Sequence, residues 1–285
     1  MEIKKVGVVG CGAMGAGIAQ VSAQAGYQVI ASEINDTLLK KGLNLIDSIL
    51  TKDVGKQKIT QADKEATLAR IKGTIDTKDF ADCDLVIEAV IENMDLKRKV
   101  FGELDKICKP EAILASNSSS LSILDMAIAT KRLDKVLGIH FFNPVPVMKL
   151  VELIRTIATS DETASAGRKF AESVGKTVVA AKDTPGFIVN YLMIPQLLNA
   201  VRILEKGVAS KEDIDNAMKL GLNHPLGPFS LIDLVGVDVV CFIAKAVYDE
   251  TKDPQFALPV LLQKMLTAGW LGRKTGKGFY DYQKA

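Results

Sequence analysis

The sequence has little histidine, no paired cysteines and almost no excess of charge of either sign. Among 285 residues there are two histidines and four cysteines, and no Cys-x-x-Cys pair occurs. Scattered thiols of this kind argue against a disulfide framework or a metal site and are typical of reduced, buried cysteines in a cytoplasmic protein. We therefore expect a cytoplasmic protein that holds no metal.

Strong charge asymmetry and long apolar runs are also missing. The 36 basic and 34 acidic residues leave a net charge of +2, which gives no argument for binding to nucleic acid or to an acidic membrane. No apolar run reaches the ~18 residues that a membrane span needs, and the N-terminal segment has no signal or transit character. The length suggests two domains.

The most informative feature present is a glycine pattern close to the N-terminus. The apolar segment Lys5–Val9 leads into Gly10-Cys11-Gly12-Ala13-Met14-Gly15, which has the pattern G-x-G-x-x-G and precedes a helical stretch. Gly10 permits a tight turn, Gly12 lets the backbone approach phosphates, and Gly15 lets the helix pack on the strand. With Ala13 and Met14 at the start of the helix, this segment predicts a site for a dinucleotide pyrophosphate.

A carboxylate stands where such a fold recognises the adenosine ribose. Glu33 follows a second predicted strand about 20 residues after the glycines, and there it can accept hydrogen bonds from the ribose hydroxyls. A carboxylate repels a 2′-phosphate and so favours NAD, although Ser32 and Asn35 beside it still tolerate NADP. Without the glycines, Glu33 would be interpreted as a solvated acid.

Alternating apolar and helical patterns over residues 1–184 predict a Rossmann-type, doubly wound α/β domain that binds NAD(P). Between Thr51 and Lys72 lies a polar insertion, either a solvated helical hairpin or a basic arm for a phosphorylated substrate. The predicted strands are Lys5–Val9, Gln28–Ala31, Leu85–Glu88, Ile113–Ser116, Lys135–Phe141, Leu150–Arg155 and Thr177–Ala180. The predicted helices are Gly15–Ala25, Asn35–Thr51, Gln61–Arg70, Met94–Ile107, Ile123–Ala127 and Asp161–Val174.

Residues 185–285 predict a helical C-terminal domain that borders the substrate cleft. The composition changes near Thr184, which we expect to cap a helix with Pro185 in its first turn. The predicted helices are Phe187–Lys206, Lys211–Leu220, Phe229–Thr251 and Ala257–Ala268, and a glycine- and lysine-rich tail follows.

His140 and Glu152 are the candidates for acid–base chemistry. His140 ends a predicted strand, and ligands of a parallel sheet bind beyond the carboxyl ends of its strands. The run around Glu152 resembles a return strand after a Pro-Val-Pro turn, which brings the carboxylate beside His140. A hydrogen bond between them would fix the tautomer and make the imidazole a better base. The alternatives are a structural histidine and a glutamate that faces water.

Other polar residues gather at predicted strand and helix ends. Asn117 to Ser120 follow the strand Ile113–Ser116, where Ser119 can polarise a carbonyl, while for Ser120 we prefer a role as a helix cap. Asn143 can brace the loop after His140 or serve the turn before Pro144. Asn190 falls in the first turns of a helix, where it can face the cleft or solvent. His224 is assigned no role.

A long string of residues carries a family resemblance. Gly138-Ile139-His140-Phe141-Phe142-Asn143-Pro144-Val145-Pro146-Val147-Met148-Lys149-Leu150-Val151-Glu152 resembles the signature of the L-3-hydroxyacyl-CoA dehydrogenases, in particular the compact bacterial 3-hydroxybutyryl-CoA dehydrogenases. Asp183 to Asn190 resemble the second signature, and Gly272 to Tyr280 resemble the family's tail. The resemblance covers essentially the whole chain.

The resemblance implies a role for each matching residue. His140 resembles the general base, Glu152 its partner, and Ser119 and Asn190 the residues that contact substrate. Lys52 and Lys56 resemble basic residues that meet coenzyme A phosphates. The positions that match residues around the cofactor are Glu33, Glu92, Lys97, Asn117 and Lys274. The glycine segment and Asn143 complete the expected cofactor site.

The expected reaction is hydride transfer between a 3-hydroxyacyl-CoA and NAD, with a homodimer formed through the helical domain. The family's use in butyrate-forming fermentation and in fatty-acid breakdown leaves the direction and the acyl chain length open. Two alternatives are a dinucleotide-binding protein of the same fold that has lost catalysis, and a dehydrogenase of free 3-hydroxy acids. The latter would use a lysine where this chain has Asn190.

Overall fold

The computed structural model describes residues 2–282. The chain divides into two compact units, Met1–Thr184 and Pro185–Ala285. Each unit has its own apolar core, one between a sheet and its helices and one among helices. The change in composition near Thr184 therefore coincides with the junction between two separately packed units.

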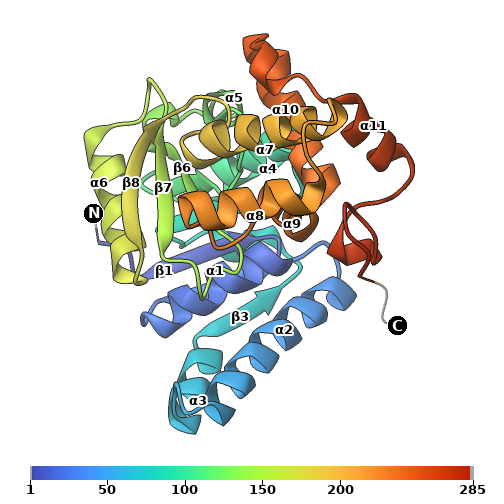
Figure 1. Cartoon of the computed structure of the whole chain (residues 1–285). Coiled ribbons are helices and arrows are strands. Elements are labelled where there is room, and N and C mark those ends of the chain that lie inside the picture. The colour runs from blue at the N-terminus through green and yellow to red at the C-terminus, as the bar shows by residue number, and fades with distance from the viewer. Residues whose placement is uncertain (1, 283–285) are drawn as a thin grey trace. The chain divides into compact units, whose positions relative to one another are not determined.

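The first unit is built on an eight-stranded sheet in the order β3-β2-β1-β4-β5-β6-β7-β8. Figure 1 shows this sheet, with β1, β3, β6, β7 and β8 labelled. Neighbouring strands are parallel except for β6 and β7, which are antiparallel. The strands are β1 (Lys5–Val9), β2 (Gln28–Ser32), β3 (Ile71–Thr74), β4 (Leu85–Glu88), β5 (Ile113–Ser116), β6 (Val136–Phe141), β7 (Leu150–Arg155) and β8 (Thr177–Lys182). Near-continuous runs of Val, Ile and Leu are typical of strands covered on both faces, as β1, β4 and β5 are.

Polar caps start most helices of this unit. The side chains of Asn35, Thr60, Asn93, Ser122 and Ser160 each accept a hydrogen bond from a backbone N–H in the first turn. The helices are α1 (Ala13–Gln24), α2 (Asp36–Gly55), α3 (Gln61–Ala69), α4 (Met94–Ile107), α5 (Ile123–Ala127) and α6 (Asp161–Ser173). Short 3₁₀ turns cover Thr77–Phe80 and Leu133–Lys135. Ser120 caps no helix, so the expectation for that residue is wrong.

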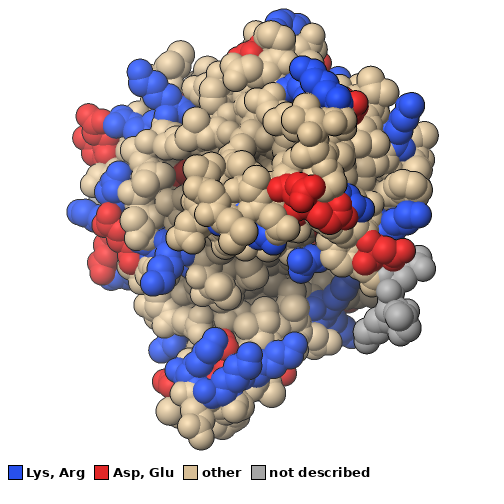
Figure 2. Space-filling model, viewed as in Figure 1, with Lys and Arg blue, Asp and Glu red and all other residues tan. Residues whose placement is uncertain are grey.

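The polar insertion is a helical hairpin followed by a strand. Helix α2 continues to Gly55, and α3 lies beside it at the β3 edge of the sheet (Figure 1). Lysine side chains gather over this end of the unit (Figure 2). The sequence prediction missed β3, which is only four residues long and contains Gly73. A side chain there would clash with Leu43, whose Cδ1 lies 2.9 Å from an ideal Cβ.

The second unit is helical. It comprises α7 (Val189–Glu205), α8 (Lys211–Leu222), α9 (Pro228–Val235), α10 (Val237–Thr251) and α11 (Val260–Thr267), with 3₁₀ turns at Pro254–Phe256 and Arg273–Thr275. Two boundaries differ from the prediction. Gly186 and Phe187 have positive φ, so a turn occupies residues 185–188 and Thr184 caps no helix there. Gly236 has φ +108°, which breaks the expected helix Phe229–Thr251 into α9 and α10.

Two buried aspartates fasten the C-terminal tail to this unit. Asp233 is 1% exposed and accepts hydrogen bonds from the N–H groups of Phe279 and Tyr280, each at 2.9 Å. Asp215 accepts from the N–H of Phe229 at 2.8 Å and from the Tyr280 hydroxyl at 3.1 Å. The tail that carries Lys274 is therefore held by charge-assisted hydrogen bonds.

Within residues 2–282, none of the helices combines the length and the apolar character needed to cross a membrane.

Candidate active site

The turn between β1 and α1 has an open anion-binding end. Gly10 has φ +91°, and a Cβ on Gly15 would lie 1.7 Å from the Gly10 carbonyl oxygen, so conformation and packing require both glycines. Gly12 differs, because its φ is −69° and a Cβ there would meet nothing within 4 Å. Gly12 is also the N-cap of α1 and supplies no side-chain cap. The open space before helical N–H groups fits a dinucleotide pyrophosphate.

Glu33 is fastened beside this turn. Its Oε1 accepts a hydrogen bond from the Cys11 N–H at 2.8 Å, and its Oε2 accepts from the Ile34 N–H at 3.1 Å. Burial, and secondarily the Glu33 charge, raises the pKa of the Cys11 thiol to about 11. The carboxylate thus lies at the end of β2 with a fixed orientation next to the glycine turn, where ribose hydroxyls are recognised in this fold.

His140 and Glu152 face each other across the antiparallel pair β6–β7. They are direct partners in the register, and the imidazole Nδ1 lies 2.7 Å from Glu152 Oε2. Glu152 is fully buried, so the alternative of a water-facing glutamate is wrong, and the expected return strand is confirmed. An ionised carboxylate only accepts hydrogen bonds, so this contact favours the tautomer in which Nδ1 carries the proton and Nε2 can accept one. This arrangement suits a general base.

Asn117 connects three strand ends around His140. Its N–H donates to the Glu88 carbonyl at 2.8 Å, and its side-chain Oδ1 accepts from the Phe141 N–H at 2.9 Å. Asn143 lies in the loop that follows β6 and precedes Pro144 through a cis peptide bond. The carboxyl ends of β4, β5 and β6 are therefore tied together beside the His140–Glu152 pair.

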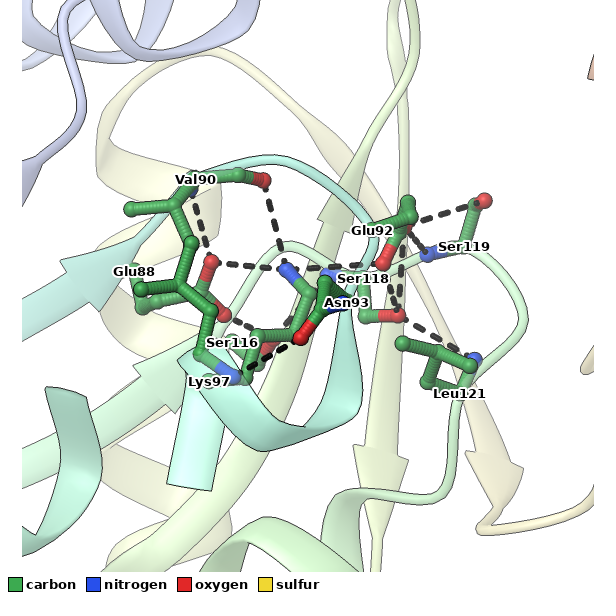
Figure 3. A network of polar contacts seen from close by, with 10 residues as sticks. Glu88, Val90, Glu92, Asn93, Lys97, Ser116, Ser118, Ser119 and Leu121 are labelled. Atoms are coloured by element: carbon green, nitrogen blue, oxygen red, sulfur yellow. Dashed lines mark hydrogen bonds and ion pairs between the residues drawn. The ribbon is translucent and has the colours of Figure 1, made fainter. Parts of the chain in front are cut away.

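A network of charges and hydroxyls joins the loops after β4 and β5, as Figure 3 shows. Glu92 accepts from the Ser118 hydroxyl at 2.9 Å and from the Ser119 N–H at 2.9 Å. Lys97, 1% exposed, places its Nζ 2.7 Å from Glu88 Oε1 and 3.4 Å from Glu92 Oε2. The structure therefore brings together Glu92, Lys97 and Ser119, which the sequence singles out separately.

Glu88 and Ser116 belong to the same network and were not singled out from the sequence. The Ser116 hydroxyl donates to Glu88 Oε2 at 2.7 Å and accepts from the Ser118 N–H at 3.1 Å. The signal that points to Glu88 is a carboxylate directly after Leu85-Val86-Ile87, at the carboxyl end of a buried parallel strand. A charge in such a position needs partners, which argues that it serves the site.

The remaining predicted residues lie in separate places. Lys52 and Lys56 are exposed at the C-terminal end of α2, and neither makes an ion pair with any residue that the structure describes. In the second unit, Asn190 is the second residue of α7. Lys274 lies in the tail, where its Nζ is 2.6 Å from Asp238 Oδ2.

Comparison with known proteins identifies the class that this fold and site define. Residues 5–184 match the family model described as 3-hydroxyacyl-CoA dehydrogenase, NAD binding domain. Residues 186–282 match the model described as 3-hydroxyacyl-CoA dehydrogenase, C-terminal domain. The chain is an NAD-binding dehydrogenase by class, and it belongs to the 3-hydroxyacyl-CoA dehydrogenase family.

Individual relatives agree with this assignment. The chain is 47% identical over 283 residues to 3-hydroxybutyryl-CoA dehydrogenase of Bradyrhizobium diazoefficiens, covering 99% of this chain and 97% of the relative. It is 48% identical to the enzyme of that name from Clostridioides difficile, covering 98% and 100%. The crystal structure of (S)-3-hydroxybutyryl-CoA dehydrogenase from Ralstonia eutropha is similar with a TM-score of 0.96 and 45% identity, covering 99% and 100%.

Proposed function

We propose that this chain interconverts (S)-3-hydroxybutyryl-CoA and acetoacetyl-CoA with NAD as the hydride acceptor or donor. The relatives reported above carry the name of this activity over nearly the full length of both chains. The observation that carries the proposal is the buried His140–Glu152 pair at the carboxyl end of β6. Because β1, β4, β5 and β6 are parallel, this end lies on the same side of the sheet as the glycine turn that follows β1. None of these names supports the catalytically silent alternative.

His140 is proposed to move the proton. In the oxidative direction, Nε2 takes the proton of the 3-hydroxyl group. Nδ1 remains hydrogen-bonded to Glu152, and the charge of Glu152 stabilises the imidazolium. In the reductive direction the imidazolium returns that proton to the 3-keto oxygen. The nicotinamide ring supplies the hydride chemistry when it is bound. Ser119 and Asn190 are proposed to hold the C3 oxygen by hydrogen bonds.

The cofactor site is proposed at the glycine turn and the adjoining loops. Gly10, Gly12, Ala13, Met14 and Gly15 would hold the pyrophosphate, and Glu33 the ribose, which favours NAD over NADP. The further residues proposed around the cofactor are Glu92, Lys97, Asn117, Asn143 and Lys274.

Lys52 and Lys56 are proposed to attract the phosphates of coenzyme A, because both are exposed and their charges are not neutralised by ion pairs within residues 2–282. A homodimer through the helical unit and a cytoplasmic location are also proposed. The four buried free thiols favour a reducing compartment.

The test is an initial-rate comparison with acetoacetyl-CoA, a longer 3-ketoacyl-CoA and free acetoacetate, each with NADH and with NADPH. We expect turnover of the coenzyme A esters with a preference for NADH. His140→Ala should lose at least about 100-fold in turnover, the low end of what a general acid–base contributes, and should still bind NADH. No turnover of any coenzyme A ester, or unchanged turnover in the variant, contradicts the proposal.

A further inference from the structure

We propose that Glu88 is a positioning residue for this site, acting through Lys97 and through the segment Ser116–Ser119. The inference rests on the proposed function only for its effect on turnover, since its structural content concerns which contacts hold Ser119. Glu88 is the last residue of β4. It lies outside the strings of residues that resemble the family's signatures.

The Glu88 carboxylate is buried at a cost that only dense hydrogen bonding offsets. It is 0% exposed, and a buried ionised group without partners destabilises a protein strongly. Three donors meet it at 2.7 Å: Lys97 Nζ and the Val90 N–H at Oε1, and the Ser116 hydroxyl at Oε2. One carboxylate thereby joins a loop, a helix and a neighbouring strand (Figure 3).

The first effect of Glu88 is on the balance between Lys97 and Glu92. Lys97 is closer to Glu88, at 2.7 Å, than to Glu92, at 3.4 Å. Glu92 uses its oxygens for the Ser118 hydroxyl and the Ser119 N–H instead. If the Glu88 charge is removed, Glu92 becomes the sole carboxylate within 4 Å of Lys97 Nζ among residues 2–282. Lys97 is buried and Glu92 is partly buried, so water screens that attraction only in part and the attraction draws Glu92 away from Ser119.

The second effect runs through Ser116. Its hydroxyl donates to Glu88 Oε2 and accepts from the Ser118 N–H, so the segment that bears Ser119 is held from the sheet side as well as from Glu92. The contacts therefore close a ring from Glu88 through Lys97, Glu92 and Ser118 to Ser116. A displacement of about 1 Å at a group that contacts substrate costs about 100-fold in rate, so loosening this ring lowers turnover.

The test uses Glu88→Gln, which keeps the shape of the side chain and removes its charge. The matched control is Asp105→Asn, in the same helix as Lys97 but near its other end. Asp105 is largely buried, with 11% of its side chain exposed against 0% for Glu88, and its Oδ1 lies 2.7 Å from Arg132 Nε. Both variants lose one ion pair, and only Glu88→Gln alters the ring of contacts.

Two readouts are measured for each variant: kcat and KM for acetoacetyl-CoA reduction, and amide hydrogen exchange. Glu88→Gln should lower kcat about 10- to 100-fold with a smaller change in KM. It should also speed exchange at Val90, Ser118 and Ser119 at least about tenfold, since one lost hydrogen bond is worth about 1.4 kcal/mol or more in such a setting. Asp105→Asn should leave kcat and these three amides unchanged and speed exchange at Lys131, whose N–H donates to Asp105.

If Glu88→Gln and Asp105→Asn have the same kcat and the same exchange rates at Val90, Ser118 and Ser119, the inference is overturned while the proposed function stands. If the unaltered protein has no turnover, the proposed function fails, and the exchange rates still decide whether Glu88 holds Ser119. If Glu88→Gln does not fold, Ser116→Ala is tested instead. It removes the hydroxyl contacts to Glu88 and to the Ser118 N–H without removing a charge. Unchanged exchange at Ser118 and unchanged kcat in Ser116→Ala then overturn the inference.

Discussion

At the scale of single residues, the groups proposed to do chemistry are held in place by other groups. Glu152 is of the second kind, because its Oε2 lies 2.7 Å from His140 Nδ1 and its side chain is fully buried. In the proposed reaction, a carboxylate in this position would fix the tautomer of the ring and stabilise the imidazolium.

Glu152→Gln should therefore lower kcat by at least about 100-fold, the low end of what acid–base groups contribute, and should leave the affinity for NADH nearly unchanged. The amide can meet Nδ1 with its NH₂ group and so favour the wrong tautomer. Steady-state kinetics and NADH fluorescence titration check this prediction. Glu172→Gln, an exposed change on α6 with 51% of the side chain accessible, is the control. Equal kcat values in the two variants contradict the assigned role.

The four thiols give a prediction about pH. Burial raises the pKa of Cys11, Cys108 and Cys241 to about 11 and that of Cys83 to about 12, from an ordinary value of 9.0. Because the folded state holds these protons more tightly, their contribution to stability is complete below pH 9.0. It is lost as the pH rises through 11 to 12. At pH 8 the native protein should react with a disulfide reagent at least about 100-fold more slowly than the protein in guanidinium. A rapidly labelled thiol in the native protein contradicts this expectation.

The pairing of His140 with Glu152 was predictable from the sequence, because a charged residue in an apolar return strand must face a partner. Glu88 shows the limit of that reasoning. The sequence marks it as a strand-end carboxylate, but its partner Lys97 is nine residues away on a helix, and their meeting depends on how α4 packs on the sheet. Ser120 was assigned to a cap that the structure gives to Ser122.

At the scale of elements, the β1–α1 turn yields a prediction from two neighbouring glycines. Gly15→Ala places a Cβ 1.7 Å from the Gly10 carbonyl oxygen, whereas Gly12→Ala meets no atom of the protein within 4 Å. We expect Gly15→Ala to destabilise the fold by about 1–3 kcal/mol through overpacking and to impair NADH binding as well.

Gly12→Ala should leave the free energy of unfolding within about 0.5 kcal/mol, as surface substitutions do, and should weaken NADH binding alone, because its methyl group occupies the space for phosphate. Urea unfolding and NADH titration of both variants separate these effects. Unaltered NADH affinity in Gly12→Ala argues against a pyrophosphate at this turn.

Elements with strong local signals were predictable, and those set by a single backbone angle were not. The glycine turn, the alternation of strands and helices, and the start of α8 after Ser210 follow from residue type. The break at Gly236 and the turn at Gly186 and Phe187 depend on positive φ angles that a helical pattern does not reveal. Strand β3 is too short, and too weakened by Gly73, to be distinguished from a loop.

At the scale of the whole molecule, the lysines at the end of α2 give a prediction about substrate charge. Lys52→Glu together with Lys56→Glu should raise KM for acetoacetyl-CoA about tenfold at low salt, with the effect fading near 1 M salt, where the screening length is about 3 Å. The reduction of a phosphate-free thioester analogue should not change. Lys131→Glu with Lys169→Glu, two exposed positions elsewhere in the same unit, is the control. Equal effects in both double variants contradict a coenzyme A site at α2.

The division into two units was predictable at this scale because composition changes abruptly near Thr184 and each side carries its own apolar pattern. The sequence also assigned the family from long signature strings, and the family models cover both units. Which buried charges share a partner was not predictable, since that depends on tertiary packing rather than on neighbours in the chain.

The contact between Glu88 and Lys97 has a consequence for descent. Loss of Lys97 leaves the buried Glu88 charge without a cation within 4 Å among residues 2–282, and loss of Glu88 leaves Lys97 with Glu92 alone at 3.4 Å. A lineage that mutates one position first therefore passes through an impaired intermediate. Drift at each position is blocked unless the other changes at nearly the same time. The two residues should therefore be kept or replaced together, so that a homologue that lacks one of them lacks both.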